Sequence, residues 1–347
     1  MYNNEKYMKR CLELARLGAG KVAPNPMVGC VVVFNGKITG EGFYRKYGET
    51  HAEVNAINSV KNQELLKEST LFVTLEPCAH FGLTPPCSDL IIEKQIPKVI
   101  IGTVDPFAAV AGNGIEKLKK AGVQVEVGIL EKECREINRR FFTFHEKGRP
   151  YIILKWAQTQ DRFIDVERSS EYYGEPTWIT GDLALRLVHK IRSEESAILV
   201  GRETARKDNP SLSVRHWDGR NPLRLVIDNQ LQLQGNLKLF DGSEKTIIFN
   251  TLKNEEKKNL RYIKIDGTEN TILQILNELY RQKILSVIVE GGKQLLESFI
   301  ELELWDEAHV FTGPKFFGSG IQAPKLNGKI IASERLDSDQ LFVFAPR

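Results

Sequence analysis

The residues that most constrain the fold of this chain are one histidine and two cysteines from two separate segments. His51 begins the first segment, and Cys78 and Cys87 belong to the second. A neutral imidazole and two thiolates can fill three corners of a tetrahedral zinc ion and leave the fourth corner for water, as a catalytic site requires. The two segments are therefore predicted to meet in the folded protein.

Glu53 lies two residues after His51 and is predicted to be a general acid/base, not a ligand. In zinc deaminases, such a glutamate takes a proton from the attacking water and passes it to the departing amine. Nucleic-acid deaminases place two residues between their cysteines, whereas Ala79 to Pro86 separate Cys78 from Cys87 here. The alternative is a structural histidine beside two ordinary buried thiols, which the joint occurrence of all four residues disfavours.

Strand and helix patterns alternate along the first half of the chain. Helices are expected at 4–17, from about 51, at 88–94 and up to 121, and strands at 27–34, 71–75, 98–104 and 123–129. Asn35-Gly36 predicts a hairpin to a return strand. The alternation favours a sheet with helices on both sides, in which strand ends deliver ligands to helix starts.

A polar breaker run at 146–150 predicts a boundary between two domains, residues 1–147 and 148–347. Two domains also suit a length of 347 residues better than a single core does. In the second half, strands are expected at 151–159, 196–201, 223–228, 246–250, 286–291, 307–312 and 341–345, and helices at 181–192, 270–282 and 293–300.

Composition excludes several classes of protein. There is no apolar run of membrane-spanning length, and the first residues lack the apolar core of a signal peptide, so we expect a cytoplasmic protein without a membrane partner. A net charge of +3 is too small to indicate nucleic-acid binding. Five cysteines argue against a disulfide framework, and Cys11 and Cys30 are predicted to be small core residues.

A second candidate site lies where the strand pattern at 286–289 runs into Glu290-Gly291-Gly292 and a helix. No GxGxxG follows the opening strand of the second half, so a standard dinucleotide-binding fold is unsupported. Glycines before a helix let its N-terminus approach a phosphate, although such a turn is also common without a ligand.

Motifs along nearly the whole chain resemble those of the bifunctional deaminase/reductases of riboflavin biosynthesis. They are PNPMVG (24–29), HAE (51–53), LEPC (75–78), TPPC (84–87), VDP (104–106), LKWA (154–157), WITG (178–181), ILVG (198–201), DNPSL (208–212) and VEGG (289–292). The resemblance implies an α/β protein with an N-terminal cytidine-deaminase-like three-layer αβα domain and a C-terminal dihydrofolate-reductase-like domain. It implies Zn2+ and NADPH as cofactors, a phosphorylated diaminopyrimidinone ribosylamine as substrate, and a homo-oligomer.

The resemblance also assigns candidate binding residues. The expected NADPH contacts are Ala157, Trp178, Thr204, Asp208, Asn229, Gly292 and Lys293. The expected substrate contacts are Asn25, His80 and Asp105 in the first half, and Lys155, Arg192, Leu212, Arg215 and Glu290 in the second. Simpler alternatives stay open: a helix-dipole role for Arg192, core packing for Trp178, a turn role for Asp208 and a surface position for Lys155.

Six residues depart from the family's usual pattern and concern substrate recognition more than zinc chemistry. Tyr44 stands where histidine is frequent, Leu83 where a basic residue is frequent, and Phe107-Ala108 where Asn-Pro is common. Arg162 replaces the glycine of an Asp-Gly turn, and Pro176 replaces a serine.

Two rival functions remain at this point. One is a nucleoside or RNA base deaminase with an unrelated C-terminal domain, which the long cysteine spacing and the mild charge disfavour. The other is a non-enzymatic module with a structural zinc, which three ligands beside a glutamate disfavour because structural zinc sites usually have four protein ligands.

Overall fold

The computed structural model describes residues 4–82, 85–107 and 111–347, and the chain divides into two compact units, Met1–Gly148 and Arg149–Arg347. The first unit contains a five-stranded sheet in the order β2-β1-β3-β4-β5. Its strands are β1 (Gly29–Phe34), β2 (Lys37–Phe43), β3 (Thr70–Leu75), β4 (Lys98–Thr103) and β5 (Gln124–Val127). β1 is antiparallel to β2 and β3, whereas β3, β4 and β5 are parallel.

The predicted hairpin between β1 and β2 is confirmed. Asn35 and Gly36 adopt φ values of 47° and 72°, the left-handed conformations that an Asn-Gly hairpin turn requires.

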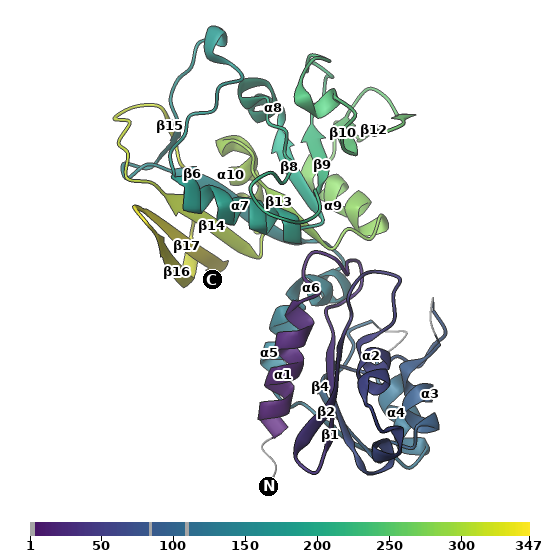
Figure 1. The fold of residues 1–347 in the computed structure, drawn as a ribbon. Helices are drawn as coiled ribbons and strands as arrows, with labels where there is room; N and C mark the ends of the chain where they lie inside the picture. The colour runs from purple at the N-terminus through teal and green to yellow at the C-terminus, as the bar shows by residue number, and fades with distance from the viewer. Residues whose placement is uncertain (1–3, 83–84, 108–110) are drawn as a thin grey trace. The chain divides into compact units, whose positions relative to one another are not determined.

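Helices cover both faces of this sheet, as predicted (Figure 1). Alternate residues of β1 point to opposite faces: Val31 packs with one set of helices, and Val32 with the other. The first set is α1 (Asn4–Arg16) and α5 (Glu131–Ile137), and the second is α2 (Ala52–Ser59), α3 (Cys87–Glu93) and α4 (Asn113–Lys120). The 3-10 helix η1 (Gln63–Glu68) and α6 (Arg139–Lys147) complete the unit. The prediction that Cys11 and Cys30 are core residues is also confirmed, since both are fully buried.

The second unit is built on a ten-stranded sheet in the order β11-β12-β10-β9-β8-β13-β6-β14-β17-β16. The strands are β6 (Tyr151–Gln158), β8 (Ala197–Gly201), β9 (Leu223–Ile227), β10 (Thr246–Asn250), β11 (Glu255–Lys257), β12 (Leu260–Lys264), β13 (Ser286–Val289), β14 (Glu307–Thr312), β16 (Gly328–Leu336) and β17 (Asp339–Pro346). In this spatial order, the seven strands that run from β12 through β6 to β14 are parallel to one another. β11, β17 and β16 extend the sheet by antiparallel pairing.

Apolar clusters lie on both faces of this larger sheet. The helices α9 (Thr271–Arg281) and α10 (Lys293–Glu301) pack on one face, and α7 (Asp182–Glu194) and α8 (Arg202–Asp208) on the other. Strand β6 is apolar on both sides, with Leu154 in one cluster and Ile153 in the other, as is typical of a parallel strand covered by helices. A small sheet pairs β7 (Phe163–Asp165) with β15 (Ile321–Gln322), and two short 3-10 helices are η2 (Ser170–Tyr172) and η3 (Lys238–Phe240). None of the helices in the described ranges is long and apolar enough to cross a bilayer.

Candidate functional site

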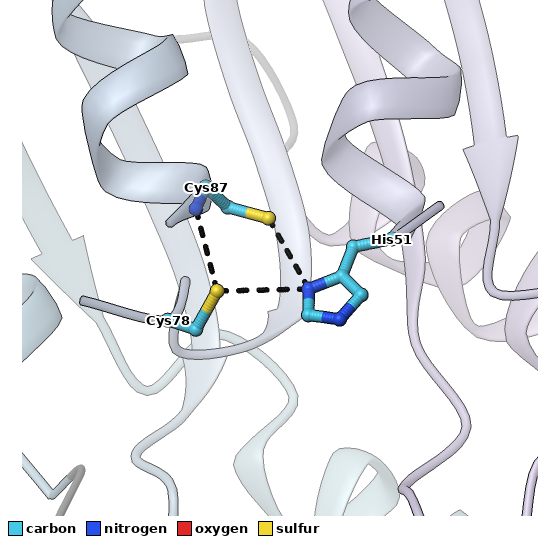
Figure 2. A group of neighbouring side chains, drawn as sticks. All are labelled: His51, Cys78 and Cys87. Atoms are coloured by element: carbon cyan, nitrogen blue, oxygen red, sulfur yellow. Dashed lines mark hydrogen bonds between the residues drawn. The ribbon is translucent and has the colours of Figure 1, made fainter. Parts of the chain in front are cut away.

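Three side chains converge where two helices of the first unit begin (Figure 2). His51 directly precedes α2, Cys87 is the first residue of α3, and Cys78 follows β3. The Nδ1 atom of His51 lies 3.6 Å from Sγ of Cys78 and 3.3 Å from Sγ of Cys87. The prediction that the two segments meet in the folded protein is therefore confirmed. One boundary differs from prediction, since α3 begins at Cys87 itself and not one residue later.

The separations fit a zinc ion. Zinc lies about 2.3 Å from a thiolate and about 2.0 Å from an imidazole nitrogen, so two such ligands of one tetrahedral ion are roughly 3.5 Å apart. The backbone N–H of Cys87 also donates to Sγ of Cys78 at 3.3 Å, which favours the thiolate. A hydrogen bond between the two thiols lowers the pKa of Cys78 and raises that of Cys87, so they share a proton that a bound metal would displace.

Glu53 is the second residue of α2 and is 3% exposed. Burial raises the pKa of its carboxyl group to about 7, and the same group interacts with Cys87. A bound zinc ion would lower this pKa, because its positive charge favours the ionised carboxylate. A carboxyl group that titrates near neutral pH suits a residue that must both accept and return a proton.

Two of the predicted substrate contacts lie close to this centre. Asp105 follows β4, and burial raises its pKa to about 6, with further electrostatic effects from Glu76, His80 and Cys78. His80 itself is exposed. Asn25, the third candidate, lies in the loop before β1 and donates from Nδ2 to the hydroxyl of Tyr44 at 3.0 Å. The positions Leu83 and Ala108 lie outside the described residues.

Sequence reasoning missed the role of Glu76, which is 4% exposed. Its carboxylate accepts hydrogen bonds from four backbone N–H groups, those of Asp105, Gly112, Gly114 and Ile115, at 2.9 to 3.3 Å. A Cβ at Gly114 would lie 2.0 Å from the carbonyl oxygen of Pro77, so this close approach requires glycine. Glu76 thus joins the segment that carries Cys78 to the segment that carries Asp105. The sequence signal was its place in the LEPC motif.

In the second unit, three predicted substrate contacts form one buried ionic cluster. Nε and Nη2 of Arg192 donate to the two carboxylate oxygens of Glu290, each at 2.7 Å, and Nζ of Lys155 lies 3.5 Å from the same carboxylate. Burial opposes the ionisation of Glu290, but Arg192 and Lys155 outweigh it and lower its pKa to about 2. The surface alternative for Lys155 is wrong, because its side chain is 15% exposed. Two cations and one carboxylate leave a net positive charge.

The remaining predicted substrate contacts, Leu212 and Arg215, lie in the segment after α8. The side chain of Leu212 is packed in the core, so a contact with a ligand would come from its backbone. The backbone N–H of Arg215 donates to Nδ1 of His189 at 3.1 Å. Sequence reasoning did not single out His189, whose pKa is lowered to about 4 by burial and by the neighbouring Arg192 and Arg215.

Several predicted cofactor contacts share one edge of the large sheet. The relevant residues at or beyond the carboxyl ends of parallel strands are Ala157 on β6, Thr204 after β8, Asn229 after β9, and Gly292 and Lys293 after β13. The Thr204 hydroxyl lies 3.4 Å from where a Cβ of Gly292 would be, so these two residues are neighbours. In open α/β sheets, ligands bind at this edge.

The simpler alternatives have different outcomes for the other two predicted cofactor contacts. Trp178 is 55% exposed, so core packing is wrong for it. Asp208 ends α8, and its carboxylate pairs with Arg168, which also pairs with Asp165. Asn209 does adopt the left-handed conformation of a turn, with φ 41°. Among the departures, Arg162 takes φ 64°, a conformation that favours glycine, and Pro176 is exposed.

Fold and donor set together define a zinc-dependent deaminase of the cytidine-deaminase type, followed by a second α/β unit of the dihydrofolate-reductase-like kind. Residues 1–103 match the family model of the cytidine and deoxycytidylate deaminase zinc-binding region, and residues 150–342 match that of the RibD C-terminal domain. The chain belongs to the RibD family of riboflavin biosynthesis proteins. Its C-terminal part is therefore a riboflavin-synthesis domain. The alternative of a base deaminase with an unrelated C-terminal domain is wrong.

Individual relatives match almost end to end. The riboflavin biosynthesis protein RibD of Aquifex aeolicus is 41% identical over 92% of this chain and 89% of the relative, and that of Escherichia coli is 34% identical over 91% and 89%. A crystal structure of a diaminohydroxyphosphoribosylaminopyrimidine deaminase/5-amino-6-(5-phosphoribosylamino)uracil reductase from Thermotoga maritima superposes with a TM-score of 0.89, at 39% identity and 99% coverage of both chains. This chain is accordingly a bifunctional enzyme of riboflavin biosynthesis, with zinc-dependent deaminase and NADPH-dependent reductase activities.

Proposed function

We propose that residues 1–147 deaminate 2,5-diamino-6-ribosylamino-4-pyrimidinone 5′-phosphate and that residues 148–347 reduce the ribosyl group of the product with NADPH. The final product is then 5-amino-6-ribitylaminouracil 5′-phosphate. The observation that carries this proposal is the convergence of His51, Cys78 and Cys87 beside the buried Glu53. The name of the matching structure from Thermotoga maritima, which states a deaminase and a reductase activity, supports it.

In the first unit, His51, Cys78 and Cys87 would hold a zinc ion, which would supply a Lewis acid for the attacking water molecule. Glu53 accepts the proton of the attacking water and returns it to the departing amine. The burial of Glu53 beside the three ligands supports this role, because a carboxyl group shielded from bulk water can pass a proton within the site. Asn25, His80 and Asp105 are the candidates that bind the pyrimidine and its sugar.

In the second unit, the buried cluster of Lys155, Arg192 and Glu290 orients the phosphorylated sugar together with Arg215 and the backbone of Leu212. Excess positive charge in a site of low exposure favours an anionic ligand. Because Glu290 is ionised and held by both cations, it is ready to accept hydrogen bonds from ribose hydroxyls.

The residues at the carboxyl edge of the sheet form the proposed NADPH site. Gly292 is the N-cap of α10, and the N-terminus of a helix suits a phosphate. Ala157, Thr204 and Asn229 line the same edge, with Lys293, Trp178 and Asp208 as flanking contacts. The pairing of Asp208 with Arg168 supports an indirect role for Asp208, in which it holds the segment around Arg168 in place.

The direct experiment incubates the purified protein with the diaminopyrimidinone ribosylamine phosphate, with and without NADPH. We expect ammonia release in both cases and loss of reduced-cofactor absorbance after NADPH is added. Cytidine and tRNA serve as comparison substrates, and deamination of either at a higher rate than that of the pyrimidine phosphate would contradict the proposal.

We further propose that the protein works in the cytoplasm as a homo-oligomer. All five cysteines are free, which suits a reducing compartment. The edge strand β16 carries Ile330 and Ile331, each 51% exposed, and exposed apolar residues on an unpaired edge favour pairing with a second copy. Light scattering of the eluted protein measures its mass in solution, and a monomer at micromolar concentration would contradict the oligomer.

Replacing Glu290 with glutamine is expected to impair the second unit alone. The change leaves Arg192 and Lys155 buried without their counter-charge, and removing one partner of a buried ion pair costs about 3–5 kcal/mol. NADPH-dependent reduction should fall at least about a hundredfold, while ammonia release keeps wild-type kinetics. The control is Glu278→Gln, whose partner Arg281 is exposed and which should change stability by less than about 1 kcal/mol. Normal reduction by Glu290→Gln enzyme would remove Glu290 from the proposed site.

Cutting the chain after Gly148 is expected to separate the two activities. Gly148 has φ 64° at the end of α6. The next residue, Arg149, pairs through Nη1 and Nη2 with the carboxylate of Asp306 in the second unit. Residues 1–148 should release ammonia with zinc alone, and residues 149–347 should oxidise NADPH when given the deaminated ribosylamine. A folded second piece that reduces nothing until the first is added back would place reductase residues in the first unit.

A further inference from the structure

Tyr44 stands at the end of β2, where family members often have histidine, and its side chain is 3% exposed. Its hydroxyl oxygen lies 3.0 Å from Nδ2 of Asn25 and 2.9 Å from the backbone N of Gly48. A backbone N–H can only donate, so the hydroxyl oxygen accepts from Gly48 and its position is fixed by the main chain.

The ring of Tyr44 also meets the ring of His51 edge to face, with centroids 5.4 Å apart and an interplanar angle of 79°. Aromatic rings in this arrangement attract each other beyond the area that they bury. One buried side chain therefore contacts both a proposed zinc ligand and the loop that carries Asn25.

The hydrogen bond to Tyr44 holds the Asn25 amide in one position. Asn25 is partly exposed, and without a partner its amide could rotate and present either the donor or the acceptor end. The contact of 3.0 Å between Nδ2 of Asn25 and the Tyr44 hydroxyl fixes the amide and leaves its other polar atom free to meet a ligand. A pyrimidinone with an exocyclic amine, a ring N–H and a carbonyl group offers both donors and acceptors to that atom.

We propose that Tyr44 is a positioning residue of the deaminase site. It holds the Asn25 amide in position to form a hydrogen bond with the pyrimidine, and it supports the imidazole of His51. The inference rests on the proposed pyrimidine deaminase function. It accounts for the tyrosine at a position where the family often uses a different residue.

Tyr44→Phe tests the hydroxyl alone, because phenylalanine keeps the ring contact with His51. Fixing a binding group through one hydrogen bond affects substrate binding more than chemistry, so kcat/KM for ammonia release should fall about tenfold through a higher KM. The kcat, the zinc content and the melting temperature should stay close to those of wild type. Tyr47→Phe is the matched control, since Tyr47 lies in the same segment with an exposed side chain and should leave all four quantities unchanged.

A double variant separates positioning from a general structural role. If Tyr44 acts through Asn25, then Tyr44→Phe combined with Asn25→Ala should be no worse than Asn25→Ala alone. Three outcomes would overturn the inference and leave the deaminase assignment intact. They are additive losses in the double variant, an unchanged kcat/KM in Tyr44→Phe or in Asn25→Ala, and a joint fall of zinc content and melting temperature. A wild-type enzyme that releases no ammonia from the pyrimidine phosphate would overturn both.

Discussion

Replacing Glu53 with glutamine is expected to abolish deamination while leaving one zinc per chain. The amide cannot carry the proton from the attacking water to the leaving amine, and proton transfer by a positioned group contributes about 10²–10⁴-fold to rate. No ligand is removed, because the zinc cluster consists of His51, Cys78 and Cys87. Ammonia release measures the loss, metal analysis measures the zinc, and NADPH-dependent reduction of the deaminated substrate should persist at the wild-type rate.

The matched control for this variant is Glu49→Gln. Glu49 is exposed and lies two residues before His51. Its replacement removes the same kind of side chain near the same helix start without changing the buried site. Its ammonia release should equal that of the wild type. Near wild-type release by Glu53→Gln enzyme would show that another group moves the proton.

The second large effect is expected from Cys87→Ser, which should remove zinc and deamination together. A serine hydroxyl is a poor zinc ligand, and a site left with one imidazole and one thiolate holds the metal weakly. The backbone N–H of residue 87 can still donate to Sγ of Cys78 in the variant, so the loss would report on the missing thiolate. Metal analysis should show zinc well below one per chain, and the first unit should melt at a lower temperature.

Cys134→Ala serves as the control for the loss of a buried cysteine. Cys134 packs in the cluster beneath α1, away from the zinc ligands, and truncating it should cost about 1 kcal/mol without loss of metal. Full zinc occupancy and activity in Cys87→Ser would mean that the eight-residue separation from Cys78 had been misinterpreted.

The zinc centre could be predicted from sequence because its chemistry depends on residue types at short spacings. The strands of the first unit could also be predicted, since runs such as 71–75 and 98–104 are apolar and bounded by polar residues. The helix α8 (Arg202–Asp208) and the strand β16 (Gly328–Leu336) were missed. Ala205 is the buried residue of α8, and β16 is exposed along most of its length, so neither has the hydrophobic period on which sequence prediction depends.

The pairings inside the second site could not be predicted for a different reason. Arg192 and Glu290 are 98 positions apart, and Arg168 and Asp208 are 40 apart. Sequence identifies each of these residues as charged but does not show which two share a buried space. Residues expected to bind ligands directly, Asp208 among them, therefore have protein partners that the sequence alone did not indicate.

The order of strands in the large sheet has a consequence for how the chain folds during synthesis. β6 is the first strand of its unit to leave the ribosome, yet its neighbours are β13 and β14, which begin at Ser286 and Glu307. Both of its edges, and the face that α9 and α10 cover, must wait for more than a hundred further residues, and such long-range pairing is slow. In the first unit, by contrast, β1 can pair with β2 across a two-residue turn. The nascent deaminase unit can thus fold while β6 of the reductase unit still has unpaired edges, the kind of surface that makes a folding intermediate prone to aggregation.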